Sequence, residues 1–162
     1  MLTLKIICVG KIKDKHLQAL IQEYSKRILK YAKLDMVEIP DEKIPDQASP
    51  AEEEAIKEKE CAQILEKLQK ISNPYIFALD LKGKQLSSED FSSKIEEIAT
   101  YSSSTIVFVI GGSLGLTKKL VAKCHFNICF SQMTFPHQLI RVFLLEQIFR
   151  AFKIQHHEKY HK

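Results

Sequence analysis

The stretch Thr105-Ile106-Val107-Phe108-Val109-Ile110, with Gly111-Gly112-Ser113-Leu114-Gly115 directly after it, decides the fold. Its first six residues form a continuous run of β-branched and aromatic side chains, which is typical of a strand covered on both faces. The glycines end this strand, and ligands of open α/β sheets bind outside the carboxyl ends of the strands. The stretch therefore predicts both a buried strand and a candidate binding loop.

Strand-like and helix-like patterns alternate along the rest of the chain. Apolar residues spaced by three and four indicate helices, as do the capping signals Ser49-Pro50 and Ser87 with Asp90. The expected strands are 4–9, 36–39, 75–81 (turned by Gly83), 105–110 and 126–130; the expected helices are 16–31, 50–68, 87–101, a short one from 117, and 136–154. This order predicts an α/β fold with a five-stranded, mainly parallel sheet and helices on both faces. With no internal repeat or flexible linker, residues 1–162 are expected to form one domain.

Composition and charge narrow the class of protein. Hydrophobic residues make up 45% and charged residues 27%, as in a globular chain. No apolar run approaches the roughly 18–20 residues of a membrane helix, and the first residues lack the layout of a signal peptide, so we expect a cytoplasmic protein without membrane contact. The net charge is +4, and the basic residues gather toward both ends around an acidic middle. If the two ends meet, they could form one phosphate-binding face, although solvated lysines would give the same pattern.

Cysteine spacing does not favour a metal site. Cys124, His125 and Cys129 are close in sequence, but zinc ligands usually show tighter paired spacing. We expect buried, reduced thiols and no bound metal.

The glycine loop does not match the common phosphate-binding motifs. Gly111 and Gly115 are one residue too close for a Walker A loop, the order Thr117-Lys118 is reversed, and no G-x-G-x-x-G motif occurs. Two interpretations of the glycine loop remain: it binds an adenosine-type ligand through backbone groups, or it is a tight turn with no ligand.

A second loop, Ser131-Gln132-Met133-Thr134-Phe135-Pro136-His137, follows another strand and precedes the last helix, so the two loops could form one pocket. His137 is a candidate base or a solvated first-turn residue. The helix is apolar around nearly its whole circumference, and because a small domain struggles to cover every face of such a helix, we expect a homodimer with this helix at the interface. Arg141 either pairs with a carboxylate or faces an anionic substrate.

The stretches 108–116 and 133–141, with Ile7-Cys8-Val9-Gly10-Lys11 and the ending Tyr160-His161-Lys162, resemble the RlmH family of SPOUT methyltransferases over essentially the whole chain. The resemblance implies a deep C-terminal trefoil knot, a homodimer, S-adenosylmethionine as methyl donor, and methylation of N3 of a pseudouridine in 23S ribosomal RNA on the assembled ribosome. It also implies that the donor-binding residues are Leu79, Gly111, Phe130, Ser131, Gln132, Met133, Thr134 and Phe135.

The chemistry of methyl transfer to a ring nitrogen suggests catalytic residues. The nitrogen must lose a proton, and a histidine, either His137 or His161, can accept it near neutrality. Alternatively, cationic Arg141 or Lys162 could stabilise the base anion while water takes the proton. Tyr160 could stack on a base. A non-enzymatic RNA-binding protein is the alternative class, and a nucleotide hydrolase is disfavoured by the loop spacing.

Overall fold

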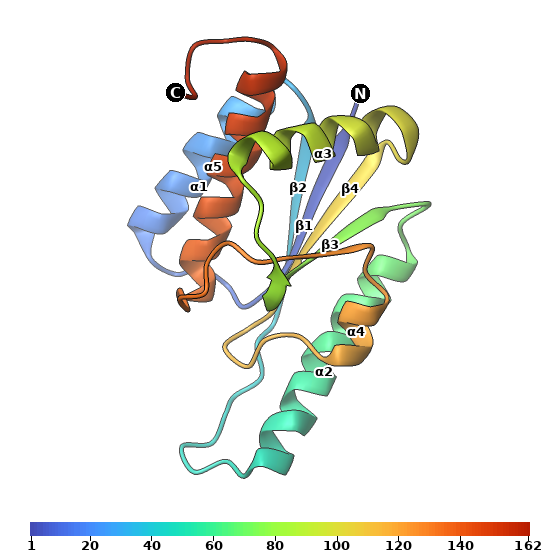
Figure 1. Cartoon of the computed structure of the whole chain (residues 1–162). Coiled ribbons are helices and arrows are strands. Elements are labelled where there is room, and N and C mark those ends of the chain that lie inside the picture. The colour runs from blue at the N-terminus through green and yellow to red at the C-terminus, as the bar shows by residue number, and fades with distance from the viewer.

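Five strands and five helices alternate along the chain, as predicted (Figure 1). The structure is a computed structural model that describes all residues, Met1–Lys162. The elements are β1 (Thr3–Val9), α1 (Lys15–Ile28), β2 (Lys33–Ile39), α2 (Pro50–Gln69), β3 (Tyr75–Lys84), α3 (Ser88–Tyr101), β4 (Thr105–Ile110), α4 (Lys118–Ala122), β5 (Phe126–Ile128) and α5 (His137–Gln155). Ser49 and Ser87 cap α2 and α3 through their side chains, which confirms the start signals in the sequence.

The sheet is entirely parallel, with the strand order β2-β1-β4-β3-β5. Register places Phe108 of β4 opposite Ile6 of β1 and opposite Phe77 of β3. Five of the six residues of β4 are buried, which confirms that this strand is covered on both faces. Because all strands run the same way, their carboxyl ends meet at one edge of the sheet.

Helices cover both faces of the sheet, as predicted (Figure 1). On one face, alternate residues such as Ile6 and Phe108 pack against α1, α3 and α5. On the other face, the intervening residues, such as Ile7 and Val109, pack against α2 and α4. The period of two along each strand therefore builds two separate hydrophobic cores.

The last helix is covered more completely within one chain than its composition suggests. It packs between α1 and α3 over the sheet, and eight of its side chains are buried. Phe143 is the large apolar side chain of α5 that remains exposed, at 40%. One chain therefore covers most of this helix but leaves Phe143 exposed, and the homodimer stays a prediction.

Two predicted boundaries differ from the structure for packing reasons. Helix α1 ends at Ile28 instead of Tyr31, and Tyr31 leaves the helix to stack on Phe152 with ring centroids 5.2 Å apart. Gly83 does not turn the chain, because β3 continues to Lys84. A Cβ at Gly83 would lie 2.6 Å from the carbonyl carbon of Ile128, so this glycine is required by the close approach of β5.

None of the helices combines the length and the apolar character that crossing a bilayer requires.

Candidate active site

The carboxyl ends of β3, β4 and β5 and the first turn of α5 surround a cavity of about 1030 Å³. Its walls come from four segments, 79–82, 110–116, 127–131 and 133–137, together with one further residue each of α2 and α5 and three residues of α4. Both loops singled out in the sequence lie in these walls, which confirms that they meet at one edge of the sheet. A cavity of this size accommodates a ligand as large as a nucleoside with a side chain.

The glycine loop is tightly folded, and two of its glycines are required by the backbone. Gly115 has a φ of +82°, and its N–H donates to the carbonyl of Gly112 at 3.0 Å. A Cβ at Gly111 would lie 2.7 Å from the carbonyl carbon and oxygen of Gly115. A Cβ at Gly112 would press on Glu60 and Val9, at 3.2 Å each, so this position faces the protein interior.

The second loop is held by its own polar contacts. The thiol of Cys129 donates to the carbonyl of Ser131 at 2.9 Å, and the Ser131 hydroxyl accepts the N–H of Met133 at 3.0 Å. Most of the residues expected to bind a donor line the cavity: Leu79, Gly111, Phe130, Ser131, Met133, Thr134 and Phe135. Gln132 is exposed and is not among the lining residues.

Polar groups on the cavity wall include a pair that sequence reasoning missed. The amide nitrogen of Asn127 donates to Asp80 at 3.1 Å, while the buried amide oxygen of Asn127 has no hydrogen-bond partner. Lys57 and Lys118 also line the cavity. A carboxylate and an unpaired acceptor suit a donor-rich cation, and the lysines suit a carboxylate. Asp80 stood out in the sequence as a charge inside the apolar run 75–81, and that signal could have revealed it.

His137 is the candidate base that the structure places at the cavity. It is the first residue of α5, it lines the cavity, and its Nε2 lies 3.5 Å from where a Cβ on Gly10 would be. Burial lowers the pKa of His137 from 6.5, the cation of Arg141 lowers it further, and Asp41 opposes the change. A neutral imidazole at this place can accept a proton at physiological pH.

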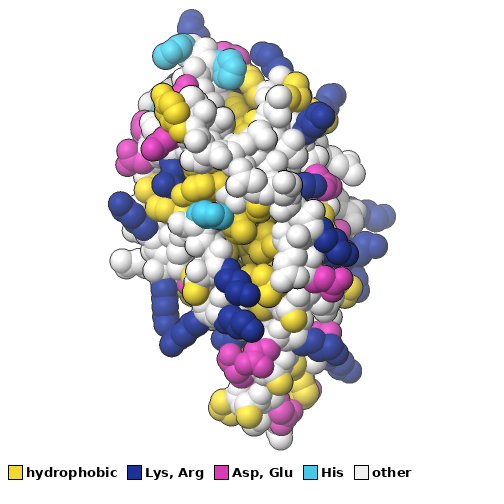
Figure 2. Space-filling model, turned by 90° about the vertical axis from the view of Figure 1, so that its right-hand side faces the viewer, with side chains coloured by type: hydrophobic (Ala, Val, Ile, Leu, Met, Phe, Trp, Pro, Cys, Tyr) yellow, Lys and Arg dark blue, Asp and Glu magenta, His cyan; other side chains and the backbone are white.

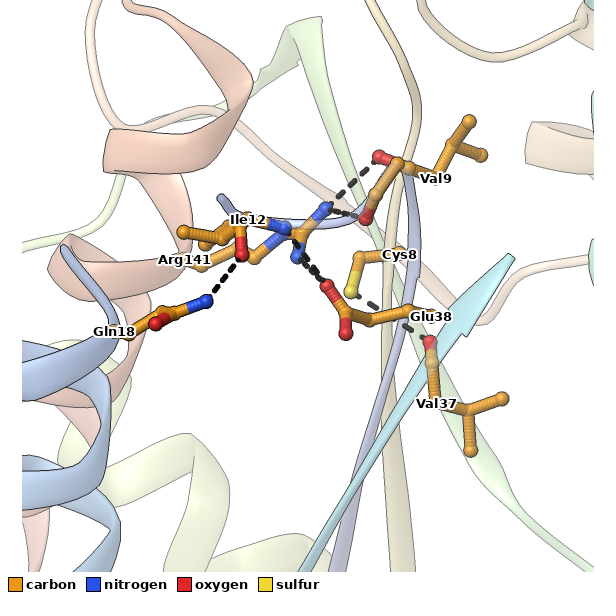
Figure 3. Close-up of polar contacts among 8 residues, drawn as sticks. Cys8, Val9, Ile12, Gln18, Val37, Glu38 and Arg141 are labelled. Atoms are coloured by element: carbon orange, nitrogen blue, oxygen red, sulfur yellow. Dashed lines mark hydrogen bonds and ion pairs between the residues drawn. The ribbon is translucent and has the colours of Figure 1, made fainter. Parts of the chain in front are cut away.

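Arg141 does not reach the cavity wall. Its side chain is completely buried, and Nη1 donates to Oε2 of Glu38 at 2.9 Å (Figure 3). Nη2 donates to the carbonyls of Val9 and Gly10 at 2.9 and 2.5 Å. Of the two alternatives that the sequence left open, pairing with a carboxylate is confirmed.

Tyr160 and His161 lie away from the cavity of their own chain. The hydroxyl of Tyr160 donates to Glu146 at 2.8 Å, and burial together with this contact raises the pKa of Tyr160 to about 12. His161 lies between Arg150, at 3.1 Å, and Glu89, at 2.6 Å. Glu146 is nine residues after His137, which is about 14 Å along the helix axis at 1.5 Å per residue. One chain therefore does not bring the tail and His137 together.

The cysteines and His125 have structural contacts. All four cysteines are free, and Cys8, Cys61 and Cys129 are buried as predicted. Nδ1 of His125 accepts the N–H of Ile76 at 2.9 Å, and its ring stacks on Tyr75. No group of three or more His, Cys, Asp or Glu side chains is arranged to hold a metal ion.

The two basic ends of the chain meet in space. Glu158 accepts the hydroxyl of Tyr31 at 2.9 Å and pairs with Lys30 at 3.5 Å and with Lys153 at 2.5 Å. On the face turned to the viewer in Figure 2, hydrophobic side chains run along the middle, with both basic and acidic side chains around them.

Comparisons with known proteins agree over the full length. A family model described as predicted SPOUT methyltransferase matches residues 2–161. The chain is 54% identical to ribosomal RNA large subunit methyltransferase H of Clostridium botulinum (strain 657 / Type Ba4) and 53% identical to that of Clostridium beijerinckii, each over 161 residues, which are 99% of this chain and 100% of the relative.

Solved structures of other proteins share the fold. A probable methylase family protein from Haemophilus influenzae Rd KW20 aligns with a TM-score of 0.57 at 14% identity, covering 100% of this chain and 72% of that one. A tRNA (m1G37) methyltransferase from Aquifex aeolicus aligns with a TM-score of 0.53 at 12% identity, covering 91% and 69%.

Proposed function

The chain belongs to the SPOUT methyltransferase family, and from this premise we propose that it transfers the methyl group of S-adenosylmethionine to a base of large-subunit ribosomal RNA. The observation that carries the proposal is the cavity of about 1030 Å³ between the glycine loop and the loop before α5. The target RNA is proposed from the full-length relatives, which are named ribosomal RNA large subunit methyltransferases.

The residues of the cavity fit the donor. The unpaired amide oxygen of Asn127 and the carboxylate of Asp80 would accept hydrogen bonds from its ammonium group, and Lys57 or Lys118 would pair with its carboxylate. Leu79, Phe130 and Phe135 would pack on the adenosyl rings, while the glycine loop allows close approach of the backbone. When bound, the donor supplies a methyl carbon on a positively charged sulfur, which a ring nitrogen can attack in line.

In this proposal the protein positions the reactants and handles one proton. Neutral His137, at the cavity, accepts the proton of the base nitrogen as the nitrogen takes the methyl carbon, and the C–S electron pair remains on sulfur. The apolar walls exclude water, and holding both reactants in line supplies much of the rate enhancement.

The finer assignment is N3 of a pseudouridine in 23S ribosomal RNA on the assembled ribosome, by a cytoplasmic homodimer. A catalytic role for Tyr160 and His161 would require a dimer, because their contacts with Glu146 and Glu89 keep them away from the cavity of their own chain. Exposed Phe143, packed edge-on against Phe135 at 5.5 Å, supports an interface beside the cavity. The resemblance to SPOUT methyltransferases is also our reason to propose a trefoil knot near the C-terminus.

The decisive experiment incubates the purified protein with ribosomes that lack the modification and with isotopically labelled donor, followed by mass spectrometry of the RNA. We expect one labelled methyl group on a 23S pseudouridine and little label in naked RNA fragments, since phosphate contacts fix position on the RNA but carry little sequence information. No transfer to ribosomes would refute the function. Calorimetry with S-adenosylmethionine and with ATP separates the alternatives, because an RNA-binding protein would bind neither and a hydrolase would bind ATP.

Mixed dimers test whether the tail acts across subunits. One chain lacking residues 160–162 is paired with one chain carrying Gly111→Ala, so that the intact tail and the intact cavity belong to different chains. We expect about half of the wild-type activity. As controls, each defective chain is paired with a wild-type chain. If both control dimers keep half of the activity while the mixed dimer is inactive, the tail acts in the site of its own chain.

A further inference from the structure

The first turn of α5 has no side-chain cap to hold it. Pro136 occupies the N-cap position, it makes no capping hydrogen bond, and the first turn contains no acidic residue. Helix starts of this kind leave several backbone N–H groups without a partner and are therefore free to fray. His137 is the first residue of this turn, so something else must fix it at the cavity.

Arg141 is the residue that ties this turn to the sheet. It lies four residues after His137, on the same side of the helix. Its guanidinium bridges the carbonyls of Val9 and Gly10, at the end of β1, to the carboxylate of Glu38 on β2 (Figure 3). With 0% exposure it cannot contact substrate.

Glu38 also connects this ion pair to the start of α1. Besides Arg141, its Oε2 accepts the N–H of Ile12 at 3.1 Å, and the carbonyl of Ile12 accepts the side chain of Gln18 in α1 at 2.7 Å. The N–H of Gly10 donates to the carbonyl of Ile39 at 2.7 Å. The ends of β1 and β2 and the starts of α1 and α5 therefore share one ion pair, in which Arg141 is fully buried and the Glu38 side chain is 37% exposed.

We propose that Glu38 and Arg141 are positioning residues, which fix the first turn of α5 to the ends of β1 and β2 and so hold His137 over Gly10 at the cavity. This inference rests on the proposed function, in which His137 accepts the proton. It also changes the role of Arg141, which acts through His137 rather than on the substrate.

The pair also sets the charge next to the imidazole. Arg141, from α5, and Asp41, from the segment after β2, are the charged groups that act on His137. Burial, followed by Arg141, lowers the pKa of His137, and Asp41 raises it. Glu38 pairs with this Arg141 cation at 2.9 Å, so the ion pair lies next to the base.

The test uses two substitutions that preserve size, Glu38→Gln and Arg141→Lys, and a control, Asp35→Asn. Asp35 pairs with Lys5 at 2.8 Å across the same two strands, but this ion pair is exposed. The titration of the His137 imidazole is followed by NMR of ¹⁵N-labelled full-length protein. Donor affinity is measured by calorimetry, and kcat is measured against pH with ribosomes.

In Glu38→Gln we expect the pKa of His137 to fall, because the Arg141 cation beside His137 loses its paired carboxylate. The acidic limb of the kcat profile should move to lower pH by the same amount. In Arg141→Lys the charge remains but the bridge to two carbonyls is lost, so kcat should fall at least about tenfold while donor affinity stays within about twofold. Asp35→Asn should change none of these quantities.

The inference is wrong if both folded variants leave the pKa of His137 and kcat unchanged, or if kcat falls in Arg141→Lys while the NMR signals of the His137 imidazole stay those of the wild type. Circular dichroism verifies folding, and Glu38→Asp replaces Glu38→Gln if the latter does not fold. The NMR titration needs no activity, so it tests the positioning even if ribosomal RNA is not the substrate.

Discussion

Replacing Gly111 by alanine should impair donor binding through a clash inside the glycine loop. The new Cβ would lie 2.7 Å from the carbonyl carbon and oxygen of Gly115, against the 3.4 Å at which ordinary contact begins, so one backbone would have to move by about 0.7 Å. The same movement would stretch the 3.0 Å hydrogen bond from Gly115 to Gly112 beyond hydrogen-bonding distance. Losing one such bond costs about 1 kcal/mol.

A backbone shift of this size in the cavity wall should weaken donor binding at least about tenfold, which corresponds to about 1.4 kcal/mol. Calorimetry with S-adenosylmethionine measures the affinity, and thermal unfolding measures the stability.

Gly115→Ala is the matched control, because a Cβ there meets nothing within 4 Å while the φ of +82° is unfavourable. That variant should lose about 1–2 kcal/mol of stability and keep most of its affinity. Wild-type affinity in a folded Gly111→Ala protein would remove the glycine loop from the donor site.

Four further variants test other parts of the molecule. Phe143→Glu should give a folded monomer by sedimentation, because this side chain is 40% exposed. Leu144→Glu should not fold, because Leu144 is fully buried. Wild-type protein that sediments as a monomer at micromolar concentration would contradict the predicted dimer interface. Deleting Tyr160-His161-Lys162 should leave donor binding nearly unchanged and reduce methyl transfer at least about a hundredfold; loss of donor binding would instead show a structural role for the tail. Lys153 and the Tyr31 hydroxyl lower the pKa of Glu158 from 4.5 to about 2, so its contribution to stability is present above pH 4.5 and is lost as pH falls toward 2. Glu158→Gln should remove that part of the acid dependence in thermal unfolding, and an unchanged profile would show that the contact is not linked to folding.

The sequence alone determined the elements of the fold, because each depends on neighbouring residues. The run Thr105–Ile110 identified the central strand, and Ser49 and Ser87 marked helix starts through bonds that span three residues. The same local reading found the two strand-end loops that line the cavity, since in a parallel sheet all such loops lie at one edge.

The tertiary structure decided what depends on residues far apart in the chain. Arg141 pairs with Glu38 across 103 residues, and Tyr31 contacts Glu158 across 127. No pattern within a window of sequence specifies such partners, because packing of whole elements brings them together. For the same reason the sequence could name His137, Tyr160 and His161 as candidates, but only the fold separated them, placing His137 at the cavity and the tail near the middle of α5.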